Sequence, residues 1–445
     1  MGYAEHFRRN IILAYPVMLS QLGHIMVGVA DSIMVGRLGA GPLAAVSLGN
    51  SLFNVALMFG IGISYAITPL VALADGEGQH QKSSEILKHG FVLNLVTGVL
   101  LFLILMGGSY GLYYLNQPAE VVRLAIPYFI IISISLIPFM AFQSYKQFAE
   151  GLSITKQAMY IIVVSNLLNI LLNYILIFGK WGGPALGLNG AGWATLISRI
   201  ILFIIMAVYV HKSARYIVYV KNFFNMNLSR KVFEKMLKIG LPTGMQFIFE
   251  VGAFSFAAIM IGWLGATSLA AHQIALNMAA VSYMMATGIS AAATVRVGNQ
   301  LGRKDFSNMR AAGFSGFIMG GAFMAISCLI FIVGKNYLPS LYINEADVIQ
   351  VAASLLVIAA FFQISDGVQV VGLGALRGMG DVKVPTLITL VAYWVLGLPI
   401  GYLLSFEYGL GPEGIWYGLL IGLSSAAILL LSRFHVMSRR KLQGV

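Results

Sequence analysis

The sequence predicts an all-α polytopic membrane protein with about twelve transmembrane helices in two six-helix lobes, which a parallel pseudo-two-fold repeat relates. Three observations lead to this fold class. First, 59% of the 445 residues are hydrophobic and only 10% are charged, whereas a soluble domain carries about 25% charged residues. Second, apolar runs of roughly 20 residues, enough to cross a bilayer as a helix, recur along the whole chain. Third, the first half of the chain matches the second half at a separation of about 226 residues.

The apolar runs define the expected spans. Each run is long enough for a transmembrane helix, so the lipid bilayer is the expected surrounding of the protein. The spans are expected near residues 10–36, 43–74, 88–115, 122–145, 158–178, 189–211, 238–262, 267–295, 311–334, 348–374, 384–405 and 415–435.

Basic residues fall in alternate connections between these spans. The chain has a formal net charge of +12, but the charge is not gathered into a patch with interleaved aromatic residues, so nucleic acid is not an expected partner. If the N-terminus is cytoplasmic, the outside connections hold only Arg37, Arg123, Lys180 and Lys335. By the positive-inside rule, both termini are therefore expected in the cytoplasm, which requires an even number of spans. Arg199 lies within a span and is expected to pair inside the protein.

The two halves of the chain carry matching segments. Each half holds six expected spans, and because six is even, both halves enter the membrane in the same orientation. The predicted N-lobe covers residues 1–211, a cytoplasmic linker covers 212–237, and the C-lobe covers 238–445. The linker is either an amphipathic interfacial helix or a solvated loop, and a substrate cavity is expected between the halves near the midplane. Matching positions include Pro16 with Pro242, Gly39 with Gly265, Gly187 with Gly409, and Gly192 with Gly414.

Several prolines lie within or near the expected spans. Proline lacks a backbone N–H and removes a helical hydrogen bond, so these positions are predicted bending points. They include Pro16, Pro138, Pro242 and Pro399.

Acidic residues are rare inside the expected spans. Only Asp31, Glu250 and Asp366 lie well within them. A carboxylate at bilayer depth costs about 2.5 to 3.5 kcal/mol on insertion scales, so it is normally kept neutral, paired with a cation or turned toward a wet cavity. Each of these conditions suits a transporter that couples to an ion.

The N-lobe holds further polar residues at helical spacing. Asn169 and Asn173 are four residues apart in the fifth span, and Ala191 and Thr195 are four apart in the sixth, so each pair shares one helix face. If these faces meet Asp31, their oxygens make a site for a hard cation or a proton. The same spacing suits ordinary interhelical hydrogen bonds, so both interpretations stay open.

Glu250 and Asp366 are the second acidic candidate, in the seventh and tenth spans. Two carboxylates that approach each other in a low dielectric do not easily both ionise, so one holds a proton or the two share a cation. Either state exchanges readily for a cationic substrate.

Three segments carry a resemblance to a known family. They are Ala271–Asn277 (AHQIALN), Arg296–Gly302 (RVGNQLG) and Gln369–Gly378 (QVVGLGALRG). On these segments the chain resembles the multidrug and toxic compound extrusion (MATE) family, NorM-like branch, over essentially its whole length. The resemblance implies an antiporter, driven by sodium or protons, that expels cationic and amphipathic drugs by alternating access. It implies no cofactor and a multi-pass position in the plasma membrane, the bacterial inner membrane, and the two-lobe design permits a functional monomer.

The resemblance also implies two sets of site residues. The set that matches the family's N-lobe cation site comprises Asp31, Asn169, Asn173 and Thr195. The set that matches the C-lobe carboxylates, which are proposed to bind cation and substrate in competition, comprises Glu250 and Asp366. Sodium is expected at one of these two sets, unless protons drive the cycle.

Two histidines are candidate modulators of these sites. His24, seven residues before Asp31, stands where a glutamine is expected in some relatives. Its titration near neutral pH would add a proton step, but an interhelical hydrogen bond is the favoured interpretation. His272 is favoured as a structural residue that bonds between helices near the outer mouth.

A flippase for lipid-linked intermediates, from the same broad superfamily, is the main alternative function. Flippases for charged headgroups usually line their cavity with several basic residues, whereas only Arg199 lies well within a span here. An intramembrane enzyme is not expected, because we expect no protease-like Gly-x-Ser-Gly or paired-Asp motif and no metal motif such as His-Glu-x-x-His. The single cysteine, Cys328, excludes disulfides and multi-cysteine metal clusters within the chain. A passive channel is not expected either, because channels normally form a pore by oligomeric symmetry.

Overall fold

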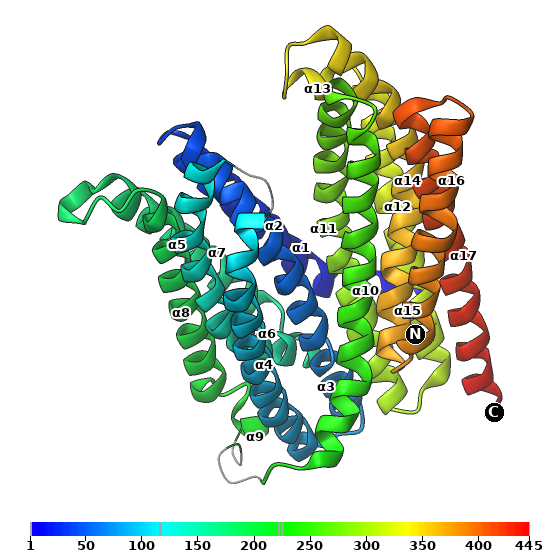
Figure 1. The fold of residues 1–445 in the computed structure, drawn as a ribbon. Coiled ribbons are helices and arrows are strands. Elements are labelled where there is room, and N and C mark those ends of the chain that lie inside the picture. The colour runs from blue at the N-terminus through cyan, green and yellow to red at the C-terminus, as the bar shows by residue number, and fades with distance from the viewer. Residues whose placement is uncertain (1, 115–117, 221–222, 224–226, 445) are drawn as a thin grey trace. The chain divides into compact units, whose positions relative to one another are not determined.

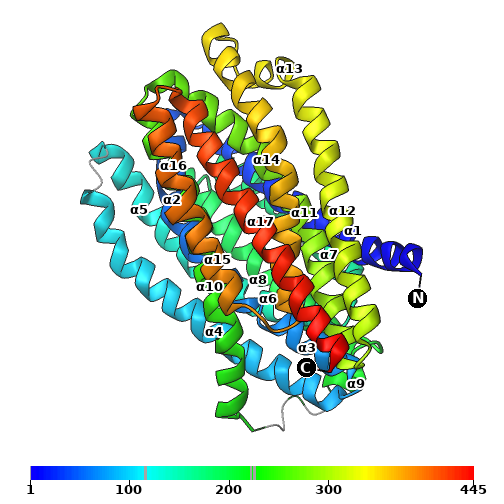
Figure 2. The same cartoon turned by 90° about the vertical axis from the view of Figure 1, so that its right-hand side faces the viewer.

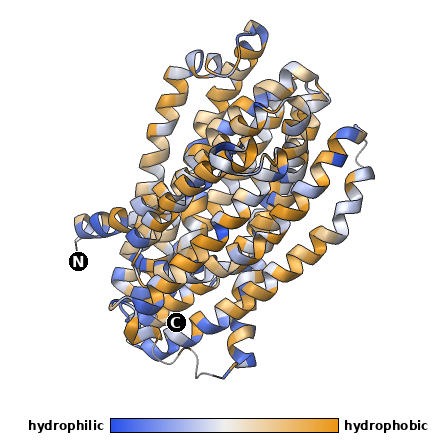
Figure 3. Ribbon diagram, turned by 90° about the vertical axis from the view of Figure 1, so that its left-hand side faces the viewer, coloured by the Kyte–Doolittle hydropathy of each residue, from blue (hydrophilic) through white to orange (hydrophobic). Residues whose placement is uncertain are grey.

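The computed structural model describes residues 2–114, 118–220, 223 and 227–444. Across these residues the regular structure is helical, and twelve helical segments are long and apolar enough to cross a membrane. The predicted all-α polytopic fold with about twelve spans is therefore confirmed. Hydrophobic residues cover most of the length of the long helices, and hydrophilic residues gather at helix ends and connections (Figure 3).

The chain divides into two compact units, which we call the N-unit and the C-unit. The N-unit is Leu19–Gly244, and the C-unit combines Met1–Met18 with Met245–Val445. Two long helices, α1 (Tyr3–Gly36) and α10 (Arg230–Gly262), each begin in one unit and end in the other (Figure 1). The units therefore differ from the predicted lobes at these two helices.

The N-unit contains the second part of α1, the first part of α10 and the helices between them. Its core forms around buried side chains of α2, α4 and α5, including Phe53, Leu101 and Phe129. Its remaining elements are α2 (Ala40–Ser64), α3 (Ile67–Gly76), α4 (His80–Gly108), the 3-10 turn η1 (Ser109–Tyr114), α5 (Ala119–Ile134), α6 (Leu136–Gly151), α7 (Lys156–Phe178), the 3-10 turn η2 (Lys180–Gly182), α8 (Leu188–Lys212) and α9 (Ile217–Val220).

Two spans of the N-unit are interrupted about four residues before a proline. Pro138 follows Ile134, the last residue of α5, and Pro69 follows Tyr65, which lies between α2 and α3. Proline cannot donate to the carbonyl four residues earlier, and its ring clashes with that carbonyl. Pro138 was predicted to be such a point, whereas the break before Pro69 was not predicted.

Pro16 and Pro242 instead lie inside continuous helices. In both α1 and α10 the boundary between the units falls shortly after the proline, following Met18 and Gly244. The matching prolines of the two halves therefore mark the positions where the chain passes from one unit to the other.

The C-unit is organised around α14, which α17 accompanies along its length (Figure 2). Its core includes Leu356, Phe362 and the fully buried Trp416. Besides its parts of α1 and α10, the unit contains α11 (Ala266–Gly302), α12 (Phe306–Gly334), α13 (Tyr337–Ser340), α14 (Ala346–Gly378), α15 (Lys383–Leu390), the π-helical η3 (Val391–Gly397), α16 (Leu398–Tyr402), the π-helical η4 (Leu403–Glu407) and α17 (Gly411–Gln443).

The eleventh span contains two π-helical segments, which lie on either side of Pro399. An α-helical turn would bring the proline ring against the carbonyl of Val395. The wider π turn at η3 includes Val395 and relieves this crowding. At Pro399, which was predicted to be a bending point, the helix therefore changes locally from α to π.

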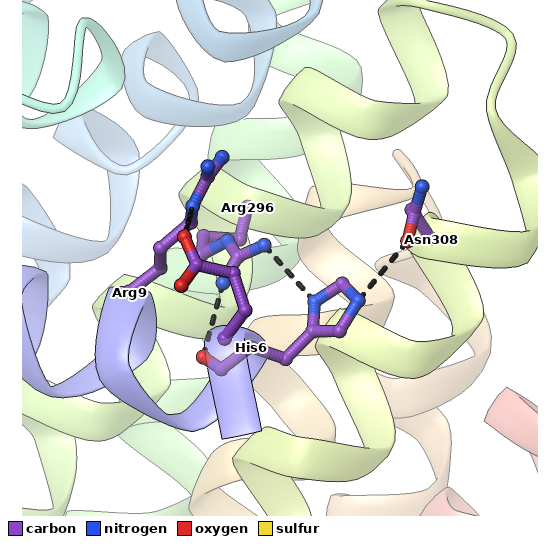
Figure 4. Close-up of polar contacts among 5 residues, drawn as sticks. His6, Arg9, Arg296 and Asn308 are labelled. Carbon is purple, nitrogen blue, oxygen red and sulfur yellow. Dashed lines mark hydrogen bonds and ion pairs between the residues drawn. The ribbon is translucent and has the colours of Figure 1, made fainter. Parts of the chain in front are cut away.

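The first turns of α1 are fastened to α11 and α12 within the C-unit (Figure 4). Arg296 donates from Nη1 to the carbonyl oxygen of His6 and from Nη2 to His6 Nδ1, both at 3.0 Å. The other ring nitrogen of His6 lies 3.1 Å from Asn308 Oδ1. One turn later, Asn10 Nδ2 donates to Ser315 Oγ at 2.9 Å. These bonds explain why the segment Met1–Met18 belongs to the C-unit.

Asp305 caps the N-terminus of α12. Its Oδ1 accepts a hydrogen bond from the backbone N–H of Asn308 at 3.0 Å, and its Oδ2 accepts one from Asn308 Nδ2 at 2.6 Å. Loss of such a cap costs about 1 kcal/mol. Asp305→Ala should therefore lower the free energy of unfolding by about 1 kcal/mol at pH 7, as measured by chemical or thermal unfolding of the purified protein.

The pH dependence of this effect has a defined sign. Hydrogen bonds from Asn308 hold the pKa of Asp305 below its usual value. The charge-dependent part of the stabilisation is therefore complete above the ordinary carboxyl pKa and is lost as the pH falls through the lowered pKa. Asp305→Asn keeps a capping oxygen and should lose less stability at pH 7 than Asp305→Ala. Equal losses in the two variants would contradict the capping role.

The described part of the predicted linker packs against the N-unit. Tyr216 is fully buried with its ring 6.1 Å from that of Phe148, and the Tyr219 hydroxyl donates to Asp75 Oδ1 at 3.0 Å. Only one short helix, α9, occurs between residues 213 and 220, and the residues from 230 onward belong to α10. The segment from 213 to 220 is therefore a packed connection with one short helix. Residues 221–222 and 224–226 lie outside the described residues, so the form of the whole linker stays a prediction.

Candidate functional site

The candidate residues of the N-unit meet around Asp31 of α1. Asn173 of α7 donates from Nδ2 to Asp31 Oδ1 and also, at 3.2 Å, to Asn169 Oδ1. The buried Asn173 Oδ1 atom of the same amide has no hydrogen-bond donor among the described residues. A carboxylate beside a buried acceptor without a donor suits a hard cation, or a proton shared with water.

Thr195 does not join this hydrogen-bonded group. It is half-buried on α8, and its side chain makes no hydrogen bond to any residue that the structure describes. The structure therefore brings Asp31, Asn169 and Asn173 together and leaves Thr195 outside their direct contacts.

Other residues near Asp31 were not selected from the sequence. The Tyr128 hydroxyl donates to Asn50 Oδ1 at 3.1 Å, and both Tyr128 and Arg199 interact electrostatically with Asp31. Tyrosine and asparagine are common in interhelical contacts, so nothing in the sequence distinguished Tyr128 or Asn50. Arg199 was visible only as a charge within a span.

His24 makes a ring contact where a hydrogen bond was expected. Its imidazole lies edge-on to Phe139, with 6.4 Å between ring centroids. No hydrogen bond joins the ring to the described part of the chain. The neighbouring cations are Arg199 and Lys146, and Lys146 is itself paired with Glu150 at 3.3 Å. A modulating role of His24 stays a prediction.

Glu250 and Asp366 belong to one buried polar group of the C-unit. Gln369 of α14 donates from Nε2 to Glu250 Oε1 at 3.3 Å, and the Tyr393 hydroxyl of η3 donates to Gln369 Oε1 at 3.1 Å. Asp366, one turn before Gln369, interacts electrostatically with Glu250. Tyr283 of α11 also interacts with Glu250. Gln369, Tyr393 and Tyr283 were not selected from the sequence.

Glu250 and Asp366 both have carboxyl oxygens that accept no hydrogen bond from the described residues. Glu250 and Asp366 are only 5% and 3% exposed. Glu250 Oε2 has no hydrogen-bond donor, and Asp366 forms no hydrogen bond or ion pair, among the residues that the structure describes. Two buried carboxylates without a direct cationic partner cannot both stay ionised at low cost, so the group fits a proton or a bound cation.

His272 connects two helices of the C-unit. Trp416 Nε1 of α17 donates to His272 Nδ1 of α11 at 3.1 Å. This bond assigns the neutral tautomer with its proton on Nε2, and the buried Nε2 atom has no acceptor in the described ranges. His272 therefore makes an interhelical contact of the kind favoured from the sequence.

The expectation that the chain lacks a Gly-x-Ser-Gly motif is wrong, because Gly313–Gly316 of α12 has this spacing, which some intramembrane proteases share. Ser315 Oγ donates to the Ala312 carbonyl at 2.9 Å and accepts from Asn10. The hydroxyl is thus held in a structural contact with an amide, which cannot act as a general base.

These features define a class of protein: a multi-pass helical membrane transporter whose two halves each contain acidic side chains within the spans. The family model described as MatE matches residues 16–175 and again 242–403. The chain therefore belongs to the MatE family. The two matches begin at Pro16 and Pro242, which are matching positions of the internal repeat found in the sequence.

Curated relatives cover almost the whole chain. Multidrug resistance protein NorM of Photobacterium profundum is 34% identical over 440 residues, which is 98% of this chain and 96% of the relative. Multidrug resistance protein MdtK of Yersinia pseudotuberculosis serotype O:1b is 35% identical over 445 residues, covering 98% and 97%. The predicted resemblance is confirmed, as is the prediction that the chain is a transporter and not an enzyme.

Solved structures share the fold at lower identity. The eukaryotic MATE transporter AtDTX14 has a TM-score of 0.89 at 21% identity, with 99% of each chain covered. An outward-facing multidrug resistance MATE family transporter of the MOP superfamily has a TM-score of 0.90 at 19% identity, covering 98% of this chain and 97% of that chain. The fold of the family thus extends over the full chain.

Proposed function

We propose that the chain is a cation-coupled antiporter that exports cationic or amphipathic compounds, with sodium or protons as the coupling ion. The protein would work by alternating access in the bacterial inner membrane, with both termini in the cytoplasm. A single monomer would be sufficient for transport. The names of the relatives support multidrug export. The acidic side chains within the spans support ion coupling.

The observation that carries this proposal is that each unit has, in the group that contains its acidic side chains, a buried oxygen without a hydrogen-bond donor among the described residues. Asn173 Oδ1 lies in the group around Asp31, and Glu250 Oε2 lies in the group with Asp366. Each is an acceptor next to a carboxyl group, in a region where leaving an acceptor unpaired is costly. A sodium ion, a proton or the cationic group of a substrate removes this cost.

The proposed cycle is an exchange at these acids. An ion that arrives from the outside neutralises the carboxylates, releases the substrate and permits the return to the inward-open state. A cationic compound from the cytoplasm then displaces the ion. The concentration gradient of the coupling ion drives the exchange, and the membrane potential adds about 2.3 kcal/mol per 100 mV for each net positive charge that enters per cycle.

The test is ethidium efflux from loaded vesicles under a sodium gradient and, separately, under a proton gradient. We expect efflux under at least one gradient. Asp31→Asn should reduce the sodium-driven rate to that of vesicles without the protein, because it removes the carboxylate beside Asn173. Asp347→Asn, an exposed acid in the first turn of α14, is the matched control and should transport normally.

The outcomes separate the remaining alternatives. Efflux that follows only protons would assign coupling to protonation of the carboxylates. Efflux by Asp31→Asn at the wild-type rate under sodium would remove Asp31 from the coupling site. No efflux under either gradient, with folded protein, would contradict the proposal and favour a flippase with a lipid-linked substrate.

A further inference from the structure

Arg199 is a cation inside a membrane span, and the equivalent position of the internal repeat has no charge. The sixth and twelfth spans match with Gly187 opposite Gly409 and Gly192 opposite Gly414. By that register Arg199 is equivalent to Ile421, an apolar residue. A charge within a membrane-spanning helix is costly and marks a functional position by default. The N-unit therefore contains an added charge where its repeat partner has none.

The guanidinium of Arg199 is held by neutral groups. Its Nη1 donates to Ser135 Oγ at 2.7 Å. Its central carbon lies 4.7 Å from the ring centroid of Phe139 and 5.2 Å from that of Phe53. Aromatic faces attract a cation through their quadrupole and restrain its position. In the described residues no carboxylate lies within ion-pair distance of Arg199.

The carboxylate that interacts with Arg199 over a longer distance is Asp31. The two opposite charges are restrained separately, since Asn173 holds Asp31 while Ser135 and the two phenylalanines hold Arg199. The other nearby cation, Lys146, is paired with Glu150. Among the described residues, Arg199 is thus the cation near Asp31 that makes no ion pair.

We propose that Arg199 is a specificity-determining residue that weakens sodium binding at Asp31. A fixed cation short of contact leaves the carboxylate open to a ligand but repels any second cation that enters. Coulomb repulsion decays only with the first power of distance and is poorly screened inside a protein. Because Arg199 carries its charge at every physiological pH, this repulsion is permanent. The inference deepens the proposed function, on which it rests for the assignment of Asp31 as an ion site.

The test is sodium binding to the purified full chain in lipid nanodiscs, measured by isothermal titration calorimetry. All variants are made in a background of Glu250→Gln with Asp366→Asn, so that only the N-unit contributes. Arg199→Gln should bind sodium roughly tenfold more tightly than its parent. Arg199→Lys keeps the charge and should bind as the parent does. Asp31→Asn combined with Arg199→Gln should remove the tightened binding.

Several results would overturn the proposal. Sodium affinity in Arg199→Gln that equals or falls below that of the parent would show that the charge does not weaken binding. Arg199→Lys behaving like Arg199→Gln would assign the effect to shape and not to charge. Tightened binding that survives Asp31→Asn would place the ion elsewhere. Arg199→Met provides a second charge-free variant if Arg199→Gln does not fold, as judged by thermal unfolding.

The proposed function is tested apart from this inference. Ethidium efflux by the unmodified chain decides whether it is an antiporter, and sodium affinity in the Arg199 series decides the role of the guanidinium. A chain without efflux whose Arg199→Gln variant binds sodium more tightly would therefore keep the inference about the site and lose only the antiporter.

Discussion

Glu250→Gln and Asp366→Asn are each expected to reduce ethidium efflux to the background of vesicles without the protein, while the purified variants remain folded. Each substitution removes the group that exchanges a proton or cation but preserves size and an oxygen acceptor. In Glu250→Gln the new amide oxygen can still accept from Gln369 Nε2, which now bonds Glu250 Oε1 at 3.3 Å. In Asp366→Asn the electrostatic interaction between the two acids disappears, so thermal stability should be equal to that of the wild type or higher.

Matched controls isolate the position from the chemical change. Glu120→Gln in the first turn of α5 and Asp347→Asn in the first turn of α14 replace exposed acids, and both should transport at the wild-type rate. Wild-type efflux by Glu250→Gln or Asp366→Asn would falsify the assignment of these carboxyl groups to the transport site.

Gly418→Val is expected to destabilise the C-unit by about 3 kcal/mol or more, the upper range for overpacking. An added Cβ at Gly418 would lie 2.4 Å from the carbonyl oxygen of Gly397 and 2.4 Å from the N and Cα atoms of Gly401. These are backbone atoms of η3 and α16, which cannot rotate away. Gly414 and Gly422, one turn to either side, make similar close approaches, so α17 contacts the eleventh span through a row of glycines.

The control for this prediction is Gly321→Val in α12. A Cβ at Gly321 meets no atom within 4 Å, so this variant reports only the cost of a β-branched residue in a helix. Thermal unfolding in detergent should place the midpoint of Gly418→Val well below that of Gly321→Val. Equal midpoints would mean that the eleventh span yields and that the glycine row does not fix its position.

The number and the approximate positions of the spans could be predicted from the sequence, because a bilayer requires apolar runs of similar length. The residues at which the helices begin and end could not be predicted. The fourth span was expected at residues 122–145, whereas α5 and α6 continue from Ala119 to Gly151. The added turns include Lys146 and Glu150, whose side chains are about 5% exposed and paired with each other. Hydropathy counts both residues as solvent-seeking, since it contains no information about a partner four residues away.

The candidate site was predictable to a similar degree. Asp31, Glu250 and Asp366 stood out because a charge is rare and costly in a membrane span. Gln369 and Tyr393, which complete the group around Glu250, did not stand out, because amides and phenols are common in helix contacts. Arg199 was expected to pair inside the protein, but its partners are a hydroxyl and two aromatic faces, and no spacing rule connects residues on different helices.

The assignment of the segment Met1–Met18 to the C-unit has a consequence for synthesis. His6 and Asn10 emerge from the ribosome early, but their partners Arg296, Asn308 and Ser315 follow about 290 to 305 residues later. At typical elongation rates of about 5–20 residues per second, this delay is on the order of 15 to 60 seconds. During that time the start of α1 must wait at the membrane with its polar side chains unmatched.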